Sequence, residues 1–142
     1  MFVSKWCKPC PDTANLVLRI VIGITFFMHG SQKVLGWFGG GGLTNVVEMM
    51  TQMDMPLAVI SAYVLSFVEF MGGIAVLLGC CTRLASGLLS IVMIVAIFKV
   101  HLKNGFFAPE GIELPFVILG GTLALFFSGC VKWGMDCMMC KK

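Results

Sequence analysis

Four long apolar stretches occupy most of this 142-residue chain, and they constrain its fold more than any other feature. They cover about residues 14–37, 57–79, 84–102 and 115–131. Each is close to the roughly 20 residues that cross a bilayer as a helix. Only 12% of the residues are charged, whereas a soluble domain has about 25%. The sequence therefore predicts an all-α integral membrane four-helix bundle in contact with the lipid bilayer.

The remaining residues are too few for a second domain. We expect residues 1–13 to form a cysteine-bearing N-terminal arm, in which Pro9 and Pro11 resist helix formation. Residues 14–131 then make the four-span membrane domain, and residues 132–142 make a cysteine-bearing C-terminal tail.

Local signals refine this division. Asn15 is placed to cap the first span, and Pro56 and Pro115 are placed to open the second and fourth. Between the first two spans, residues 43–53 have apolar side chains at helical spacing. That segment is predicted to be an amphipathic helix along the membrane surface.

Positive charge is concentrated at the two termini and in the second connection. The residues concerned are Lys5, Lys8, Arg83, Lys132, Lys141 and Lys142. Because such charge favours the cytoplasmic side, both termini are predicted to be cytoplasmic. No cleavage site follows the first apolar run, so we expect it to be retained in a multi-pass protein of the cell (inner) membrane.

Several polar side chains fall inside or beside the predicted spans, where lipid makes them costly. They come from three spans: Arg19, His29, Gln32, Lys33, Glu69, His101 and Asn104. His29, Gln32, Lys33, His101 and Asn104 fall in the outer half of the bilayer and Glu69 lies nearer its middle, so side chains from three helices predict a polar pocket within the bundle. The plainer interpretation is that the cations reach the interface as anchors, or that a buried ion pair has only a structural role.

Glu69 lies near the middle of the second span, on a helix face shared with Ser66 and Gly73. These small neighbours would let another helix approach the carboxylate closely. The carboxylate needs Arg19, His29 or Lys33 as a cationic partner, or else it remains protonated.

A series of short motifs occurs in order along residues 14–131. They are His29-Gly30-Ser31-Gln32-Lys33, Gly36-Trp37-Phe38-Gly39-Gly40, Glu69-Phe70-Met71-Gly72-Gly73, Leu78-Gly79 with Thr82-Arg83-Leu84-Ala85, His101-Leu102-Lys103-Asn104-Gly105-Phe106-Phe107 and Gly111-Ile112-Glu113. Together they resemble the signature of the DoxX family of small membrane proteins.

The resemblance implies four helices and a link to redox or sulfur metabolism, since relatives belong to a quinol oxidase complex or act in quinone-coupled thiosulfate oxidation. It implies a membrane quinone as the cofactor. The implied catalytic residues are Glu69, His29 and Lys33, and the implied cofactor-binding residues are Arg19, Gln32, His101 and Asn104. Hydrogen-bond donors and a titratable group suit a quinone headgroup.

Seven cysteines are many for so short a chain. Cys7 and Cys10 in Trp-Cys-Lys-Pro-Cys look like a thioredoxin-type active-site pair, and Cys137 and Cys140 have the same spacing. These four thiols are alternatively a metal site for zinc, copper(I) or an iron–sulfur cluster. They are also compatible with incidental small apolar residues. An even number of spans between them places all the cysteines at one membrane face.

The leading hypothesis is a quinone-linked membrane oxidoreductase that exchanges electrons with thiols, Cys7 and Cys10 included, or with a sulfur compound. A non-catalytic anchor or assembly subunit of a redox complex is the alternative, for which Gly120 and Gly121 offer a small-residue face. A thiolate metal-binding membrane protein is the third. A protein partner in a redox complex is expected, a homo-oligomer is left open, and no nucleic-acid signature is present.

Overall fold

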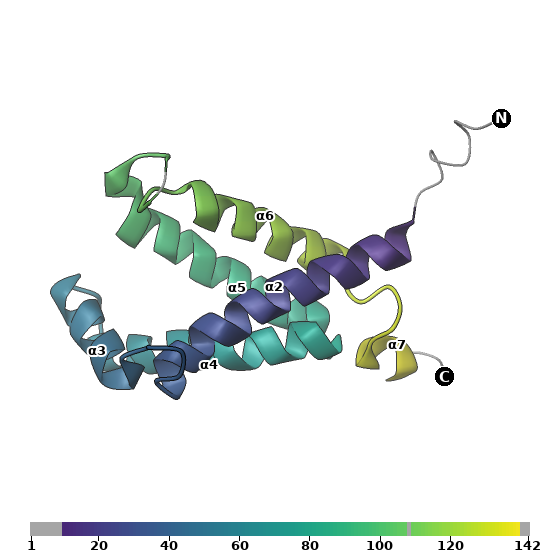
Figure 1. Ribbon diagram of the computed structural model, residues 1–142, viewed down its shortest axis with the longest axis horizontal. Coiled ribbons are helices and arrows are strands. Elements are labelled where there is room, and N and C mark those ends of the chain that lie inside the picture. Colours follow the sequence, from purple (N-terminus) through teal and green to yellow (C-terminus); the bar gives the residue numbers. More distant parts are fainter. Residues whose placement is uncertain (1–9, 108, 140–142) are drawn as a thin grey trace.

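The structure is a computed structural model that describes residues 10–107 and 109–139, and this part of the chain contains helices and no strand (Figure 1). In chain order the elements are α2 (Pro11–Val34), α3 (Gly42–Gln52), α4 (Ala58–Leu78), α5 (Thr82–Ala96), the π-helical turn η1 (Ile97–His101), the 3₁₀ turn η2 (Leu102–Asn104), α6 (Glu113–Ser128) and α7 (Met135–Met139). The predicted all-α bundle is confirmed.

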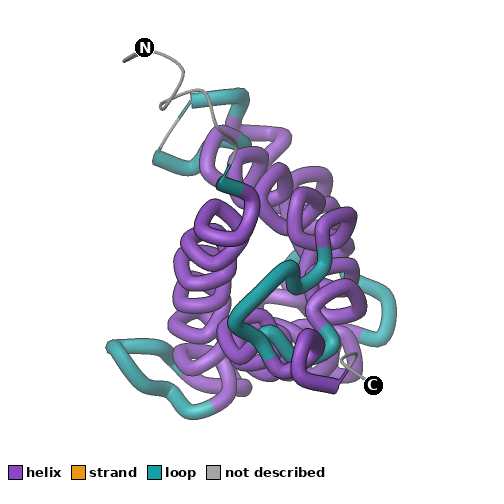
Figure 2. Tube along the Cα trace, turned by 90° about the vertical axis from the view of Figure 1, so that its right-hand side faces the viewer, coloured by secondary structure: helices purple, strands orange, loops and turns teal. Residues whose placement is uncertain are grey.

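The four longest helical segments pack as a closed bundle. Helix α2 contacts α4 and α6, and α5 contacts the same two helices from the other side. Helix α3 packs on α2 and α4 at one end of the bundle (Figure 1). We call this the cavity end. The opposite end, where α2 and α5 begin, where α4 and α6 end and where α7 lies, is called the cysteine end (Figure 1), and it faces the viewer in Figure 2.

Within the described residues, three helical segments are long and apolar enough to cross a membrane: Pro11–Val34, Ala58–Leu78 and Thr82–Asn104. Helix α6 is apolar but shorter, with 16 residues, and it ends at Ser128 rather than at the predicted residue 131. Large apolar side chains cover the outside of the bundle, whereas serines and threonines are buried inside it. This distribution suits a lipid environment, because the outer faces need no water.

Helices α2 and α4 approach each other through glycines. A Cβ atom on Gly73 would lie 2.5 Å from the backbone nitrogen of Phe27, and one on Gly30 would collide with the backbone of Phe70. The α4 face predicted around Glu69 is indeed buried, Ser66 included. Small residues therefore bring the two backbones into contact, as the sequence predicted.

The start of α2 corrects two predictions. The helix begins at Pro11, inside the predicted arm. Proline is tolerated at the first helical position, because the N–H that it lacks would have no partner within the helix there. Asn15 is not its cap. The Asn15 amide instead donates to Ser128 Oγ at 2.9 Å and to the Gly129 carbonyl at 2.8 Å, and so joins α2 to the end of α6.

Two further details differ from expectation. Helix α4 begins at Ala58 after a left-handed Leu57, so Pro56 lies in the preceding turn, whereas Pro115 does lie in the first turn of α6. Gly121 does not form an exposed small-residue face with Gly120. A Cβ there would lie 2.7 Å from Ile22 Cδ1, so the absence of a side chain allows α6 to pack on α2.

Candidate functional site

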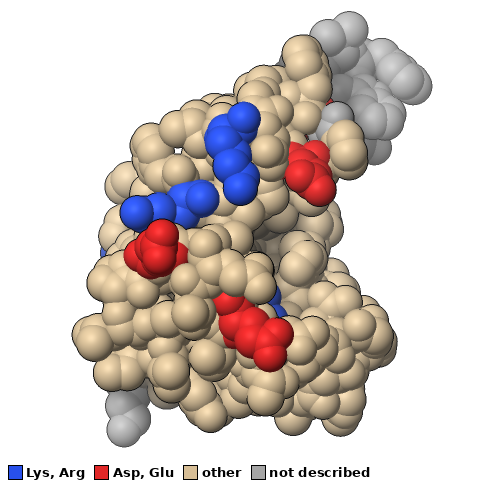
Figure 3. Space-filling view, turned by 90° about the vertical axis from the view of Figure 1, so that its left-hand side faces the viewer, with Lys and Arg blue, Asp and Glu red and all other residues tan. Residues whose placement is uncertain are grey.

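A cavity of about 320 Å³ lies at the cavity end, between α2, α4, α5 and the start of α6 and beside α3. From this side the surface is hollowed, with a few charged groups on an otherwise uncharged exterior (Figure 3). The titratable side chains that line the cavity are His29, Lys33, Glu69, Lys99 and His101. Four of these five were predicted as site residues from the sequence, and the structure brings those four to one cavity.

An ion pair joins two helices at the cavity wall. Lys33, in the last turn of α2, places Nζ 2.5 Å from each carboxylate oxygen of Glu69 in α4. The Glu69 side chain is 4% exposed and the Lys33 side chain 23%. Lys33 is thus the partner that Glu69 needed. A buried carboxylate is costly without a cationic partner, and Lys33 is the residue that supplies one to Glu69.

His29 lies one helical turn before Lys33. Its Nδ1 is 2.8 Å from the Thr25 carbonyl oxygen. Because a carbonyl can only accept a hydrogen bond, Nδ1 carries the proton in this arrangement. In this tautomer Nε2 is the ring nitrogen that carries the lone pair.

His101 reaches the cavity from the opposite wall, at the end of the π-helical turn η1. Such turns interrupt the regular α-helical ladder and often occur at functional sites. His101 Nδ1 is 2.8 Å from the Glu110 carbonyl, so this ring too is held as the Nδ1–H tautomer. Asn104 Nδ2 donates to the same carbonyl at 3.2 Å and does not line the cavity. Asn104 therefore supports the loop that orients His101.

The apolar part of the wall is rich in methionine, which sequence reasoning missed. The methionines are Met49, Met50, Met53, Met55 and Met93, and Phe26 and Leu65 lie among them. Most come from α3 and the turn after it. Their thioether side chains are flexible and polarizable, so they can adapt to the shape of a bound ligand. The available signal was the amphipathic spacing of residues 43–53, which we had assigned to the membrane surface alone.

Two predicted site residues lie elsewhere. Gln32 donates to the Phe38 carbonyl at 3.3 Å, beside the glycine-rich turn, and does not line the cavity. Arg19 lies at the cysteine end. It is 14 residues before Lys33 in the same helix, which at about 1.5 Å per residue separates them by roughly 20 Å along the axis.

Arg19 is 1% exposed and hydrogen-bonds mainly to backbone carbonyls. Nε donates to Val76 O at 3.1 Å and Nη2 to Leu77 O at 3.0 Å, at the carbonyl end of α4. Nη1 donates to Lys132 O at 3.2 Å and to Trp133 O at 3.4 Å. The negative end of the helix dipole and these carbonyls stabilise the buried cation. This position ties the segment after α6 to α4.

The described cysteines share the cysteine end, as expected. They are Cys10, Cys80, Cys81, Cys130 and Cys137. Cys7 and Cys140 lie outside the described residues, so the pairs Cys7–Cys10 and Cys137–Cys140 and their four-thiolate metal site remain predictions. Cys137 contacts Cys130, with 3.5 Å between their Sγ atoms.

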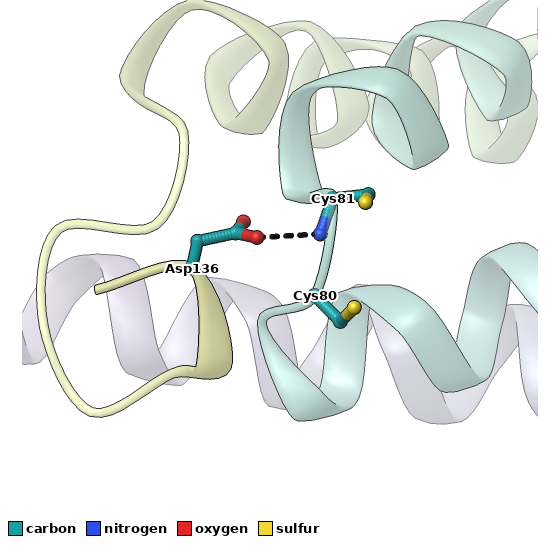
Figure 4. Close-up of side chains that lie close together, drawn as sticks. All are labelled: Cys80, Cys81 and Asp136. Atoms are coloured by element: carbon teal, nitrogen blue, oxygen red, sulfur yellow. Dashed lines mark hydrogen bonds between the residues drawn. The ribbon is translucent and has the colours of Figure 1, made fainter. Parts of the chain in front are cut away.

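A second group at this end consists of Cys80, Cys81 and Asp136, whose possible ligand atoms lie within 4.8 Å of one another. The Asp136 carboxylate, however, points at the Cys81 amide, and both sulfur atoms point away from it (Figure 4). It accepts hydrogen bonds from Cys81 N at 2.6 Å, Thr82 N at 2.8 Å and Thr82 Oγ1 at 2.8 Å. Asp136 therefore caps α5 across 54 residues of sequence rather than presenting free oxygens to a metal.

This capping is reflected in the acidity of Asp136. Partial burial favours the neutral acid, but the hydrogen bonds from Thr82 and Cys81 outweigh it and hold the pKa of the carboxyl below its usual value. The positive charge of Arg19 acts in the same direction. The carboxylate is thus ionised where α7 docks on the start of α5.

Fold and site together define a small helical membrane protein with a buried ion pair beside an apolar cavity. The chain matches the DoxX family over residues 14–102, and it belongs to that family. It is 30% identical over 125 residues to the Bacillus subtilis protein named "Putative oxidoreductase CatD", covering 88% of this chain and 86% of that protein.

A Haemophilus influenzae protein described only as uncharacterized is 31% identical over 117 residues, covering 78% of this chain and 72% of that protein. No solved structure matches the chain. Family membership and the apolar helices together establish an integral membrane protein.

Proposed function

We propose that this DoxX protein is a membrane oxidoreductase whose cavity binds the headgroup of a membrane quinone. The observation that carries the proposal is the Lys33–Glu69 ion pair at the wall of an otherwise apolar cavity. Membrane proteins bury such pairs rarely and usually where they serve a function. The name of the Bacillus subtilis relative agrees with redox chemistry.

Size and lining support a ligand of this class. A cavity of about 320 Å³ falls at the lower end of the range of about 300–1,000 Å³ typical of small-molecule sites. Methionine side chains suit a flat ring, while cationic and imidazole groups suit its oxygen atoms. When bound, a quinone supplies a two-electron carrier whose oxygens gain and lose protons.

The chain itself would orient the ring and move the protons. Lys33 is a donor for a carbonyl oxygen, and Glu69 keeps that ammonium in place. His29 and His101 have their Nδ1 protons fixed on backbone carbonyls, which leaves Nε2 to accept a proton or, once protonated, to return it. Electrons would come from thiols or a reduced sulfur compound.

Binding to purified protein in lipid nanodiscs tests this proposal. We expect short-chain ubiquinone or menaquinone analogues to bind the native protein and to bind Glu69→Gln at least tenfold more weakly. Glu113→Gln is the matched control, because Glu113 lies at the same end of the bundle but does not line the cavity. Equal binding to both variants, or none to native protein, would favour a non-catalytic subunit.

A further inference from the structure

Two cysteines at the cysteine end are close enough to form a disulfide. Cys130 follows α6 and Cys137 lies in α7, and their Sγ atoms are 3.5 Å apart. A disulfide bond is about 2.05 Å long, so closure requires a movement of only about 1.5 Å. The Cys137 thiol also donates to the Cys130 carbonyl at 2.9 Å, which holds it beside its neighbour. This pair was not predicted from the cysteine spacing.

Arg19 places a positive charge beside one of the two sulfur atoms. Its Nη1 donates to Cys130 Sγ at 3.3 Å, and its burial and four carbonyl bonds fix the cation in place. A fixed positive charge beside a sulfur stabilises the thiolate. The same charge repels a metal cation. Arg19 therefore disfavours a metal cation at Cys130 and partly offsets the effects that oppose its thiolate.

The two thiols differ in access. Cys137 lines a surface recess together with Lys132 and Trp133, whereas Cys130 does not line it. An external reagent therefore meets Cys137 first. Partial burial and the hydrogen bond from Cys137 raise the pKa of the Cys130 thiol, while Arg19 opposes the rise. Cys130 is thus suited to act second, on a sulfur already held next to it.

We propose that Cys137 and Cys130 form a thiol–disulfide exchange site that reacts with a small organic disulfide. The Cys137 thiol loses its proton to solvent, and the resulting thiolate attacks the external disulfide, whose sulfur–sulfur bond breaks and releases one thiolate that takes up a proton. The Cys130 thiol then loses its proton to solvent, and its sulfur attacks Cys137 Sγ. The Cys130–Cys137 bond forms as the second external thiolate leaves. Two protein thiols are oxidised, and one disulfide is reduced to two thiols.

The bond would join elements that are now held by weaker contacts. Residues 130–139 already bind Arg19 of α2 through Lys132 and Trp133, and Asp136 caps α5. A disulfide across this segment would fix it on the ends of three helices. The site is independent of the quinone proposal, because it lies at the opposite end of the bundle.

Oxidised glutathione is the probe that tests this inference. The fully reduced, full-length protein in nanodiscs is incubated with it, remaining thiols are blocked, and tryptic peptides are identified by mass spectrometry. Cleavage after Lys132 separates the two cysteines, so their disulfide appears as a linked peptide pair, and fragment ions distinguish Cys137 from Cys140 in the same peptide. We expect that pair to be the main product. Main products that join Cys137 to another cysteine would overturn the proposal.

Two variants separate the steps. In Cys130→Ser, the second step is blocked, so glutathione should accumulate as a mixed disulfide on Cys137. In the matched control Cys81→Ser, the Cys130–Cys137 pair should form as in the native protein. The rate of the second step should also rise with pH as Cys130 ionises. A Cys130→Ser protein that acquires no glutathione, or a pH-independent second step, would contradict the mechanism.

Discussion

The two ends of the bundle bury a cation in different ways. At the cavity end, Lys33 is neutralised by the single carboxylate of Glu69. At the cysteine end, Arg19 is surrounded by four backbone carbonyls and one thiol. The first arrangement depends on one side chain, whereas the second is distributed over the backbone of α4 and the segment after α6.

This difference indicates what each end can do. A charge with one partner can be released when a ligand or proton changes that partner, so the Lys33–Glu69 pair is suited to chemistry. A charge held by carbonyls cannot be neutralised by protonation of its partners. Arg19 is therefore suited to be a fixed point that orients its surroundings, Cys130 included.

The largest expected effect on stability comes from removing one partner of the Lys33–Glu69 ion pair. Lys33→Met leaves the buried Glu69 carboxylate alone, and we expect a loss of about 3–5 kcal/mol in unfolding free energy. The double variant Lys33→Met/Glu69→Leu should recover most of that loss, because no charge is left buried. Thermal unfolding in detergent measures both. A double variant no more stable than the single one would show that the pair is not coupled.

At the cysteine end, the expected loss of stability depends on whether Arg19 or its thiol partner Cys130 is changed. Arg19→Lys loses the planar fork that reaches several carbonyls, so we expect about 2–3 kcal/mol of destabilisation. Cys130→Ala removes one of five hydrogen-bond partners and should cost less than half as much. The same unfolding assay applies. Equal losses in the two variants would mean that the thiol, rather than the carbonyls, stabilises the cation.

Disturbing the close contact between α2 and α4 should have a smaller effect on stability. Gly30→Ala places a methyl group on the backbone of Phe70 and should cost about 1–3 kcal/mol by forcing α2 and α4 apart. Gly120→Ala is the control, since nothing lies within 4 Å of the added Cβ. It should be neutral or slightly stabilising. Similar losses in both variants would rule out the close α2–α4 contact.

The smallest effect concerns the docking of α7. Because docking lowers the pKa of Asp136, it is favoured while the carboxyl is ionised and is lost as the pH falls below the usual carboxyl value. Hydrogen exchange should show residues 130–139 opening below about pH 4. Asp136→Asn should open the segment at neutral pH as well, at a cost of about 1 kcal/mol. If residues 130–139 of the native protein exchange at the same rate at every pH, and Asp136→Asn does the same, the Asp136 carboxylate does not hold α7 in place.

The sequence predicted the cavity end better than the cysteine end, for a physical reason. A charged residue in an apolar span needs a partner, so Glu69 predicted a nearby cation, and Lys33 was one of the three candidates. The small residues around Glu69 likewise indicated the face that α2 covers. Partners of Arg19 are carbonyls, which every residue has, so nothing in the sequence distinguishes them.

The long-range contacts of residues 130–139 were equally hard to predict from the sequence. Asp136 caps a helix whose own N-cap is Cys81, a residue that provides no side-chain cap. Local capping rules look within one turn and cannot find a partner 55 residues away. The Cys130–Cys137 contact depends on the same docking of α7, which explains why the regular two-residue spacings suggested other pairs.

Photolabelling with an azido-quinone tests the central claim, that the cavity end is the ligand site, most directly. The native protein in nanodiscs is illuminated with the reagent, and labelled residues are located by mass spectrometry. We predict labels on the cavity methionines of residues 49–55 and on residues 93–101, reduced by excess quinone. Labels spread over the lipid-facing side chains and unaffected by competing quinone would contradict the claim.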